Sequence, residues 1–143
     1  MQCKLKITKL FFDKPAIVRA VDRTTRRVLS KIGSYVWRAA KSSIRKRERI
    51  SQPGQPPSSH TGLLQRFIFF AYEPDDKTVV IGPVKLSKPV SNTTLPSLEH
   101  GGYSLRKKRG KINRVYIRAR PFMQPALQQE LPKLPEMWRN AVR

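Results

Sequence analysis

The feature that most constrains the fold is an apolar stripe that runs through residues 15–47. Its side chains recur at steps of three or four residues, which is the spacing of one face of an α-helix. Asp13 can cap this helix, and Pro15 lies where a first helical turn tolerates proline. We therefore predict a long amphipathic helix that ends at about Arg47. The stripe consists of Ile17, Val21, Val28, Ile32, Tyr35, Ala39 and Ser43, widened by Val18, Leu29 and Val36.

The opposite face of this helix is basic, and so is most of the chain. Thirty Lys and Arg against nine Asp and Glu give the 143 residues a formal net charge of +21. Such a surface repels itself and attracts acidic partners, which include nucleic acid, an anionic membrane and an acidic protein. Composition does not choose among these three. Two dense basic runs supply candidate contacts with another subunit or with DNA, namely Arg45, Lys46, Arg47, Arg106, Lys107, Lys108, Arg109 and Lys111.

The segments between the helix and the middle of the chain predict short strands and loops. Residues 3–7, which include the lone Cys3, alternate between apolar and polar like a half-buried strand. Residues 51–62 contain three prolines and two glycines, so we expect an exposed arm or connector. Residues 65–73 and 78–84 are apolar segments separated by a short polar link, which is typical of a β-hairpin. Residues 85–94 predict a polar loop.

The last third of the chain predicts a strand between two helical pieces. Residues 95–100 form a short helical turn that Gly101 and Gly102 end. The basic segment 104–113 is expected to be a mobile loop or a lengthened hairpin tip, followed by a strand at 114–119. A C-terminal helix starts at Pro121, and Pro132 and Pro135 kink it or divide it into two pieces. The fold predicted for residues 1–143 is a single α+β domain, in which a long N-terminal amphipathic helix and a C-terminal helix pack on a small antiparallel sheet, with an extended arm and loop.

Motifs for catalysis, metal binding or cofactor binding are missing from the sequence. His60 and His100 are far from each other, and neither lies at ligand spacing from a cysteine or an acidic pair, which disfavours a metal site. The acidic cluster around Asp75 falls in a predicted turn, where such residues commonly act as turn formers. The glycine pairs lack the strand-to-helix setting of a phosphate-binding loop. We therefore expect that the protein is not an enzyme and binds no cofactor.

Five segments form an ordered series of landmarks. They are the long basic helix, a Pro-rich stretch that ends in TGLL, a strand that ends in GP, the segment LEHGG and the segment ARPFMQPAL. In this order they resemble the neck and tail-completion proteins of long-tailed, lambdoid-type phages, a group that includes tail-terminator-like and minor tail proteins. The landmark residues are Thr61, Gly62, Gly82, Pro83, Glu99, Gly101, Gly102, Arg120, Pro121, Phe122 and Pro125.

The resemblance implies a structural protein of the virion, made in the host cytoplasm and without a membrane partner. It implies a ring, most simply a hexamer, that joins head-closure or connector proteins to tail-tube proteins and surrounds the path of the DNA. Most landmark residues are expected to determine the fold, with Phe122 anchoring the last helix as a buried aromatic. Glu99 is one of only nine acids, and we expect it to pair with an arginine of its own or a neighbouring subunit.

Two other classes of function stay open. Charge alone favours a non-specific nucleic-acid-binding module, although the sequence contains no recognisable binding-fold motif. Tyr103 and Tyr116 flank the second basic run, but their separation along the chain does not predict a base-stacking platform. An enzyme of the phage assembly apparatus would need a constellation of titratable residues, and the sequence does not present one.

Overall fold

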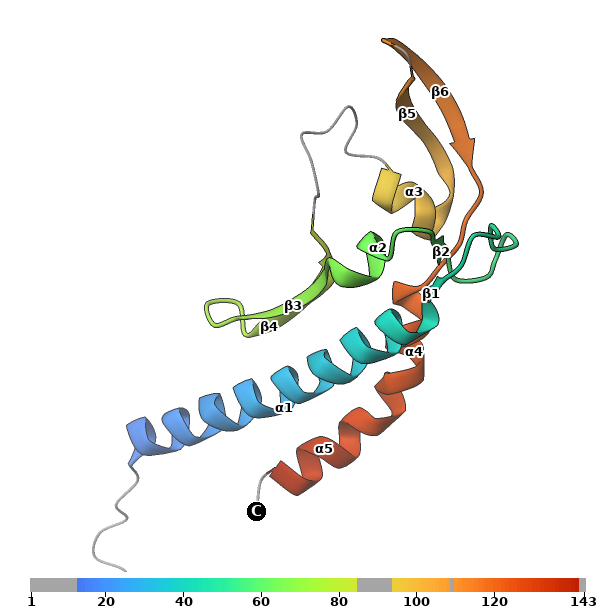
Figure 1. The fold of residues 1–143 in the computed structure, drawn as a ribbon. Coiled ribbons are helices and arrows are strands. Elements are labelled where there is room, and N and C mark those ends of the chain that lie inside the picture. The colour runs from blue at the N-terminus through green and yellow to red at the C-terminus, as the bar shows by residue number, and fades with distance from the viewer. Residues whose placement is uncertain (1–12, 85–93, 109, 142–143) are drawn as a thin grey trace, which may run out of the picture.

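The computed structural model describes residues 13–84, 94–108 and 110–141 (Figure 1). The strand predicted at residues 3–7, most of the loop at 85–94 and the basic residue Arg109 lie outside the described residues. In chain order the elements are α1 (Lys14–Ser43), β1 (Arg45–Lys46), β2 (Ser58–Ser59), α2 (Leu63–Arg66), β3 (Ile68–Glu73), β4 (Thr78–Pro83), α3 (Thr94–His100), β5 (Gly102–Lys108), β6 (Lys111–Ile117), α4 (Met123–Glu130), the 3₁₀ turn η1 (Leu131–Lys133) and α5 (Leu134–Ala141).

The long helix α1 begins as predicted and ends earlier than predicted. Asp13 caps it, because its side chain accepts a hydrogen bond of 3.0 Å from the backbone N–H of Ala16. The helix stops at Ser43, since Ile44 adopts an extended conformation and is only 1% exposed. Burial of Ile44 turns the chain at this point. The expected continuation of the helix to Arg47 is therefore wrong, and Arg45 and Lys46 form the short strand β1 instead.

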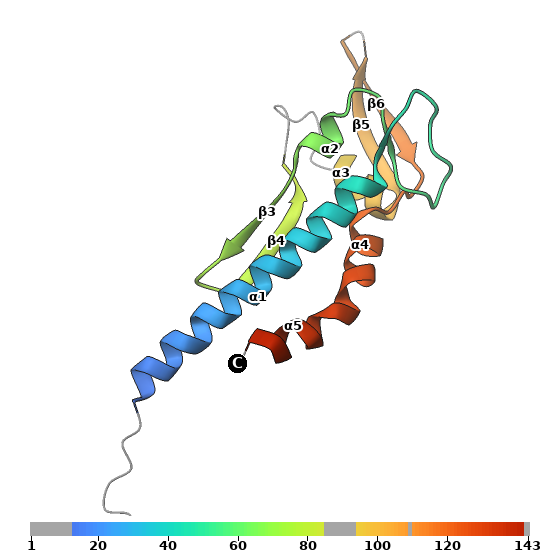
Figure 2. The same cartoon turned by 60° about the horizontal axis from the view of Figure 1, so that its bottom comes forward.

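Helix α1 lies between two layers. The β3–β4 hairpin packs on one side of it, and α4 and α5 pack on the other (Figure 1, Figure 2). The indole N–H of Trp37 donates a 2.7 Å hydrogen bond to the carbonyl of Ile68, which fixes the start of the hairpin against the helix. Glycine at position 33 allows close approach, because a Cβ there would lie 2.7 Å from Cγ1 of Val79.

The hydrophobic core is small and sits at the C-terminal half of α1. Only side chains from Val28 onward are buried on this helix. Ile68 and Phe122 bring the hairpin and α4 into the same cluster, with exposed fractions of 0% and 2%. This arrangement confirms the predicted α+β domain with a long N-terminal helix and a helical C-terminus. The core cluster is Ile32, Val36, Ala40, Ile44, Ile68, Phe122 and Ala126.

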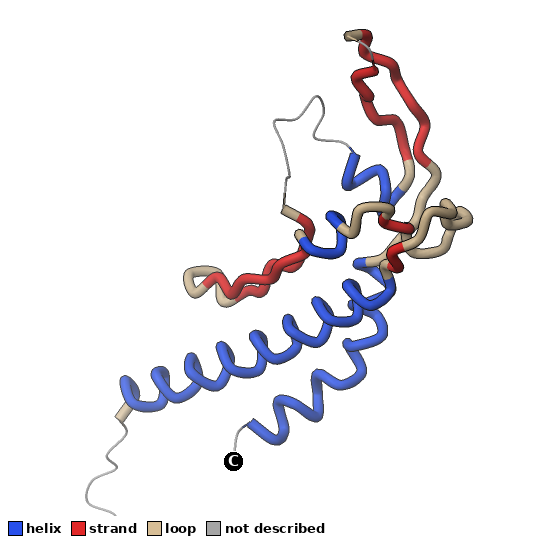
Figure 3. The backbone as a smooth tube through the Cα atoms, viewed as in Figure 1, coloured by secondary structure: helices blue, strands red, loops and turns tan. Residues whose placement is uncertain are grey.

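The strands form three separate two-stranded sheets where one antiparallel sheet was expected. β3 pairs with β4 and β5 pairs with β6, both antiparallel, while β1 and β2 form a two-residue parallel pair (Figure 3). For residues 104–113, the prediction of a mobile loop is wrong, and the alternative prediction of a lengthened hairpin is confirmed. Gly110, with φ of +79°, allows the turn that joins the two strands.

The proline-rich segment 51–62 is less exposed than predicted. Its residues Ser51, Pro57 and Ser59 are buried. Pairing of β2 with β1 holds the end of this segment, and the backbone N–H of Gly54 donates a 2.9 Å hydrogen bond to the carbonyl of Ala119. The segment is therefore a connector tied to the body at several points. The expected break in the C-terminal helix is confirmed, because η1, which contains Pro132, separates α4 from α5.

A surface ion pair ties the turn of the β3–β4 hairpin to α1. Nζ of Lys77 lies 2.6 Å from Oδ1 of Asp22, and both side chains are about half exposed. The hydrogen bond to Asp22, and then the charge of Asp22, raise the pKa of the Lys77 ammonium above its ordinary value of 10.5. Exposed pairs of this kind stabilise a fold weakly, so this ion pair contributes little to holding the hairpin against α1.

We expect Gly33→Ala to lower the free energy of unfolding by about 1 kcal/mol. Alanine favours a helix by up to about 1 kcal/mol over glycine, but the added methyl group would overpack against Val79, which costs about 1–3 kcal/mol. Urea unfolding measures the difference. In the Val79→Ala background the loss should shrink. A stabilised Gly33→Ala protein would show that α1 and β4 are not in close contact.

Candidate functional site

The carboxylate of Glu99 joins two landmark segments. Its Oε2 accepts hydrogen bonds from the backbone N–H groups of Phe122 and Met123, at 3.0 and 3.2 Å, and its Oε1 accepts one of 2.8 Å from that of Gln124. These donors stand at the start of α4, where backbone N–H groups have no partner within the helix. A carboxylate there is also favoured by the helix dipole. Glu99 thus caps α4 from another element.

The expectation that Glu99 pairs with an arginine of its own chain is wrong within the described residues. Three backbone donors occupy its two oxygens instead. The physical reason is local: the start of α4 is rich in unpaired donors, and Phe122 at its N-cap offers no side-chain acceptor. An acidic side chain is the group that best satisfies such donors, since hydrogen bonds to a charged acceptor are the stronger ones.

A third landmark segment, the proline-rich stretch, contacts the chain just before α4. The backbone N–H of Arg120 donates a 2.6 Å hydrogen bond to the carbonyl of Leu98, and its Nε donates one of 3.1 Å to the carbonyl of Ser51. The carbonyl of Ala119 accepts the bond from Gly54 described above. The proline-rich connector, α3 and the start of α4 are therefore held together. We call this set the junction: Ser51, Gly54, Leu98, Glu99, Gly101, Ala119, Arg120, Phe122, Met123 and Gln124.

The conformations expected at the junction are present. Gly101 and Gly102 have φ of +78° and +136°, backbone angles that residues other than glycine rarely adopt. A Cβ on Gly101 would also lie 3.3 Å from the backbone nitrogen of Ala119. Pro121 directly precedes the buried ring of Phe122, and Pro125 lies exposed in the first turn of α4. All of these residues serve the fold rather than offering groups for a reaction.

The TGLL end of the proline-rich stretch and the GP landmark lie outside the junction. The hydroxyl of Thr61 accepts a 3.4 Å hydrogen bond from the backbone N–H of Leu63, and Gly62 starts α2 in the left-handed conformation, with φ of +76°. Gly82 and Pro83 lie at the end of β4, opposite Phe69 and Ile68. These residues position the β3–β4 hairpin rather than the junction.

The candidate basic contacts occupy two different elements. Arg45 and Lys46 in β1, and Arg47 directly after it, are exposed. Lys111 is exposed at the start of β6, whereas the backbone of the preceding basic residues forms the end of β5. The side chains of Arg106, Lys107 and Lys108, and all of Arg109, lie outside the described residues.

The sequence missed one arrangement, an exposed face on the β5–β6 hairpin. Tyr103 and Tyr116 are opposite each other, with ring centroids 5.1 Å apart, and the guanidinium carbon of Arg114 lies 4.0 Å from the centroid of Tyr103. The prediction that these tyrosines lie far apart is therefore wrong, while the absence of a base-stacking platform stays a prediction. Gly110 between the two segments was the signal that could have indicated their pairing. We call this the outer hairpin face: Tyr103, Leu105, Ile112, Arg114 and Tyr116.

A second exposed feature lies at the start of α1. Ile17, Val18 and Val21 are 45%, 46% and 56% exposed, although they continue the stripe that is buried from Val28 onward. The first turns of the helix extend beyond both the β3–β4 hairpin and α5 (Figure 1, Figure 2). We call Ile17, Val18 and Val21 the free stripe. No other described element packs on it closely enough to bury it.

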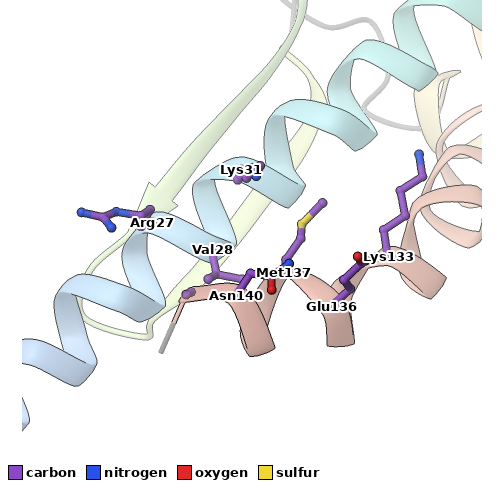
Figure 4. Close-up of a pocket in the computed structure, with 8 residues that line it drawn as sticks. Arg27, Val28, Lys31, Lys133, Glu136, Met137 and Asn140 are labelled. Carbon is purple, nitrogen blue, oxygen red and sulfur yellow. The ribbon is translucent and has the colours of Figure 1, made fainter. Parts of the chain in front are cut away.

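A shallow groove of about 370 Å³ separates α1 from α5. Met137 reaches from α5 toward α1 (Figure 4). Four of the lining side chains are charged, of which three are cations and one is Glu136. Its lining residues are Arg27, Val28, Lys31, Lys133, Glu136, Met137, Asn140 and Ala141.

Within the part of the chain that the structure describes, the histidine and acidic side chains form no group of three that could hold a metal ion. Among the same residues, no helix combines the length and the apolar character needed to cross a membrane. Comparisons of the chain with protein-family models, curated proteins and solved structures found no match. The resemblance to phage neck proteins therefore stays a prediction from the landmarks.

We expect Glu99→Ala to lower the free energy of unfolding by about 1–3 kcal/mol, because it removes the acceptor of three N–H groups at the start of α4. Thermal or urea unfolding measures this loss. Glu48→Ala is the matched control, since Glu48 is exposed and should change stability by less than about 0.5 kcal/mol. Equal losses in the two variants would contradict the role of Glu99 as a cap.

Proposed function

We propose that the protein is a structural component of a tailed bacteriophage, which assembles into a ring at the neck or tail end of the particle. The order of the landmarks supports this proposal. Further support comes from the junction, where three landmark segments that are distant in sequence contact one another. A set of short motifs that cooperate in one structural unit is more specific than the same motifs taken singly.

The observation that carries the proposal is the free stripe. Full burial of one Val or Ile side chain is worth about 1.5–3 kcal/mol, and three such side chains on one helix face are about half exposed here. A stripe that is continuous with the core, and that no other described element covers, is suited to contact with another chain. In a ring, each copy would present this stripe to a different surface of the next copy.

The charge sets the conditions under which such a ring forms. Each chain carries a formal +21, so neighbouring copies repel each other at low salt. Salt at about 0.15 M screens exposed charges beyond about 8 Å, and bound anions reduce the repulsion further. Acidic neighbours or DNA would therefore strengthen a ring that moderate salt already permits.

The proposal predicts a discrete oligomer in solution at moderate salt. A hexamer, six chains of 16.5 kDa, has a mass of about 99 kDa. Light scattering behind a sizing column measures this mass, and the measurement is repeated with added double-stranded DNA. A protein that remains a monomer at every concentration, with and without DNA, would overturn the proposal.

A matched pair of variants tests the surface that assembles. Val21 on α1 and Val80 on β4 are both 56% exposed. We expect Val21→Glu to reduce the oligomer to monomers, since it places a carboxylate in an apolar contact, while Val80→Glu leaves the mass unchanged. Circular dichroism verifies that both variants are folded. The same mass for both variants, or dissociation of both, would contradict assembly through the free stripe.

A further inference from the structure

The β5–β6 hairpin is strongly cationic. Residues 102–117 contain six Lys and Arg and no Asp or Glu. The base of the hairpin is packed, since Ser104 is 4% exposed and the hydroxyl of Ser97 donates a hydrogen bond of 3.4 Å to the carbonyl of Tyr103. The two strands extend away from α1 beyond this base (Figure 1). The hairpin is thus anchored at one end and presented at the other.

The outer hairpin face holds a cation in place beside two hydroxyl groups. Tyr103 and Tyr116 are 56% and 59% exposed, and their rings meet edge to face at 5.1 Å. Arg114 lies over the ring of Tyr103 at 4.0 Å, a cation–π contact that limits its conformations. Phosphate oxygens in DNA accept hydrogen bonds from arginine and from tyrosine hydroxyls. The three side chains therefore form a compact, preordered set of donors.

We infer that the outer hairpin face binds the phosphate backbone of double-stranded DNA, with Arg114 as the charged contact and Tyr103 and Tyr116 as hydroxyl donors. Two strands about 4.8 Å apart fit beside or within a major groove of about 12 Å, which admits a two-stranded ribbon. The inference rests on the proposed function only for the source of the duplex, the DNA that passes through the ring.

Charge density favours DNA over an acidic protein. Seven-residue strands are about 23 Å long, and a duplex presents one phosphate charge per about 1.7 Å of its axis. Arg114 on this face would therefore meet a closely spaced row of phosphates, whereas a protein surface brings basic groups of its own. Ring geometry favours a duplex over a single strand. Arg114 and Tyr116 both contact the ring of Tyr103, which leaves less ring surface for an unstacked base.

The test compares Arg114→Gln with Arg23→Gln, which removes the same charge from an exposed site on α1. Binding of a labelled duplex of about 20 base pairs is measured by fluorescence anisotropy between about 50 and 200 mM salt. We expect Arg114→Gln to weaken binding about five- to tenfold and to reduce the salt slope by about 1. Arg23→Gln should change neither quantity. Tyr103→Phe with Tyr116→Phe keeps both rings and should cost about two- to threefold.

Several outcomes would overturn the inference. Equal losses in Arg114→Gln and Arg23→Gln would show that net charge alone binds DNA. A single strand of the same length that binds more tightly than the duplex would assign the face to single-stranded nucleic acid. Polyglutamate that binds as tightly as the duplex, with the same loss in Arg114→Gln, would assign it to an acidic protein. Unfolding curves verify that each variant retains the stability of the parent.

The inference and the proposed function fail in different ways. If the protein forms a ring of the expected mass but Arg114→Gln does not change its affinity for DNA, the proposed function stands and the inference is wrong. A strict monomer whose DNA affinity falls only in Arg114→Gln does the reverse. The Arg114→Gln protein is therefore also measured by light scattering, where its mass should equal that of the parent.

Discussion

The carboxylate of Glu99 at the start of α4 is the interaction on which the rest of the fold depends. It accepts hydrogen bonds from the backbone N–H groups of Phe122, Met123 and Gln124, and it thereby sets where α4 begins. That position delivers the ring of Phe122 to the core beside Ile44 and Ile68. The same stretch of chain, through Ala119 and Arg120, holds the proline-rich connector and α3. One buried end of the molecule is organised around a single cap.

A core at one end of a long helix leaves the other elements to extend from it. Among the described residues, the first turns of α1 carry exposed apolar side chains, and the β5–β6 hairpin is packed at its base. Such elements contribute little to the stability of an isolated chain, since they bury little apolar surface. Under the proposed function they would complete their packing by contact with other subunits.

The two projecting elements offer different chemistry. The free stripe is apolar on a basic helix, so it suits a protein surface once the surrounding charge is screened. The outer hairpin face combines tyrosines with a fixed arginine on a ribbon without acids, so it suits phosphates. A protein that assembles around DNA needs both kinds of surface. Keeping them on separate elements allows each to be altered without the other.

The sequence by itself determined the features that depend on local pattern. Periodicity predicted α1 and the β3–β4 hairpin, Gly101 and Gly102 marked the end of α3, and proline broke the C-terminal helix, because each depends on residues a few positions apart. Only the tertiary structure decided which distant groups meet: the backbone donors of Glu99, the burial of the connector and the pairing of Tyr103 with Tyr116. Those contacts depend on register and packing between segments, and the residue pattern of either segment alone does not contain that information.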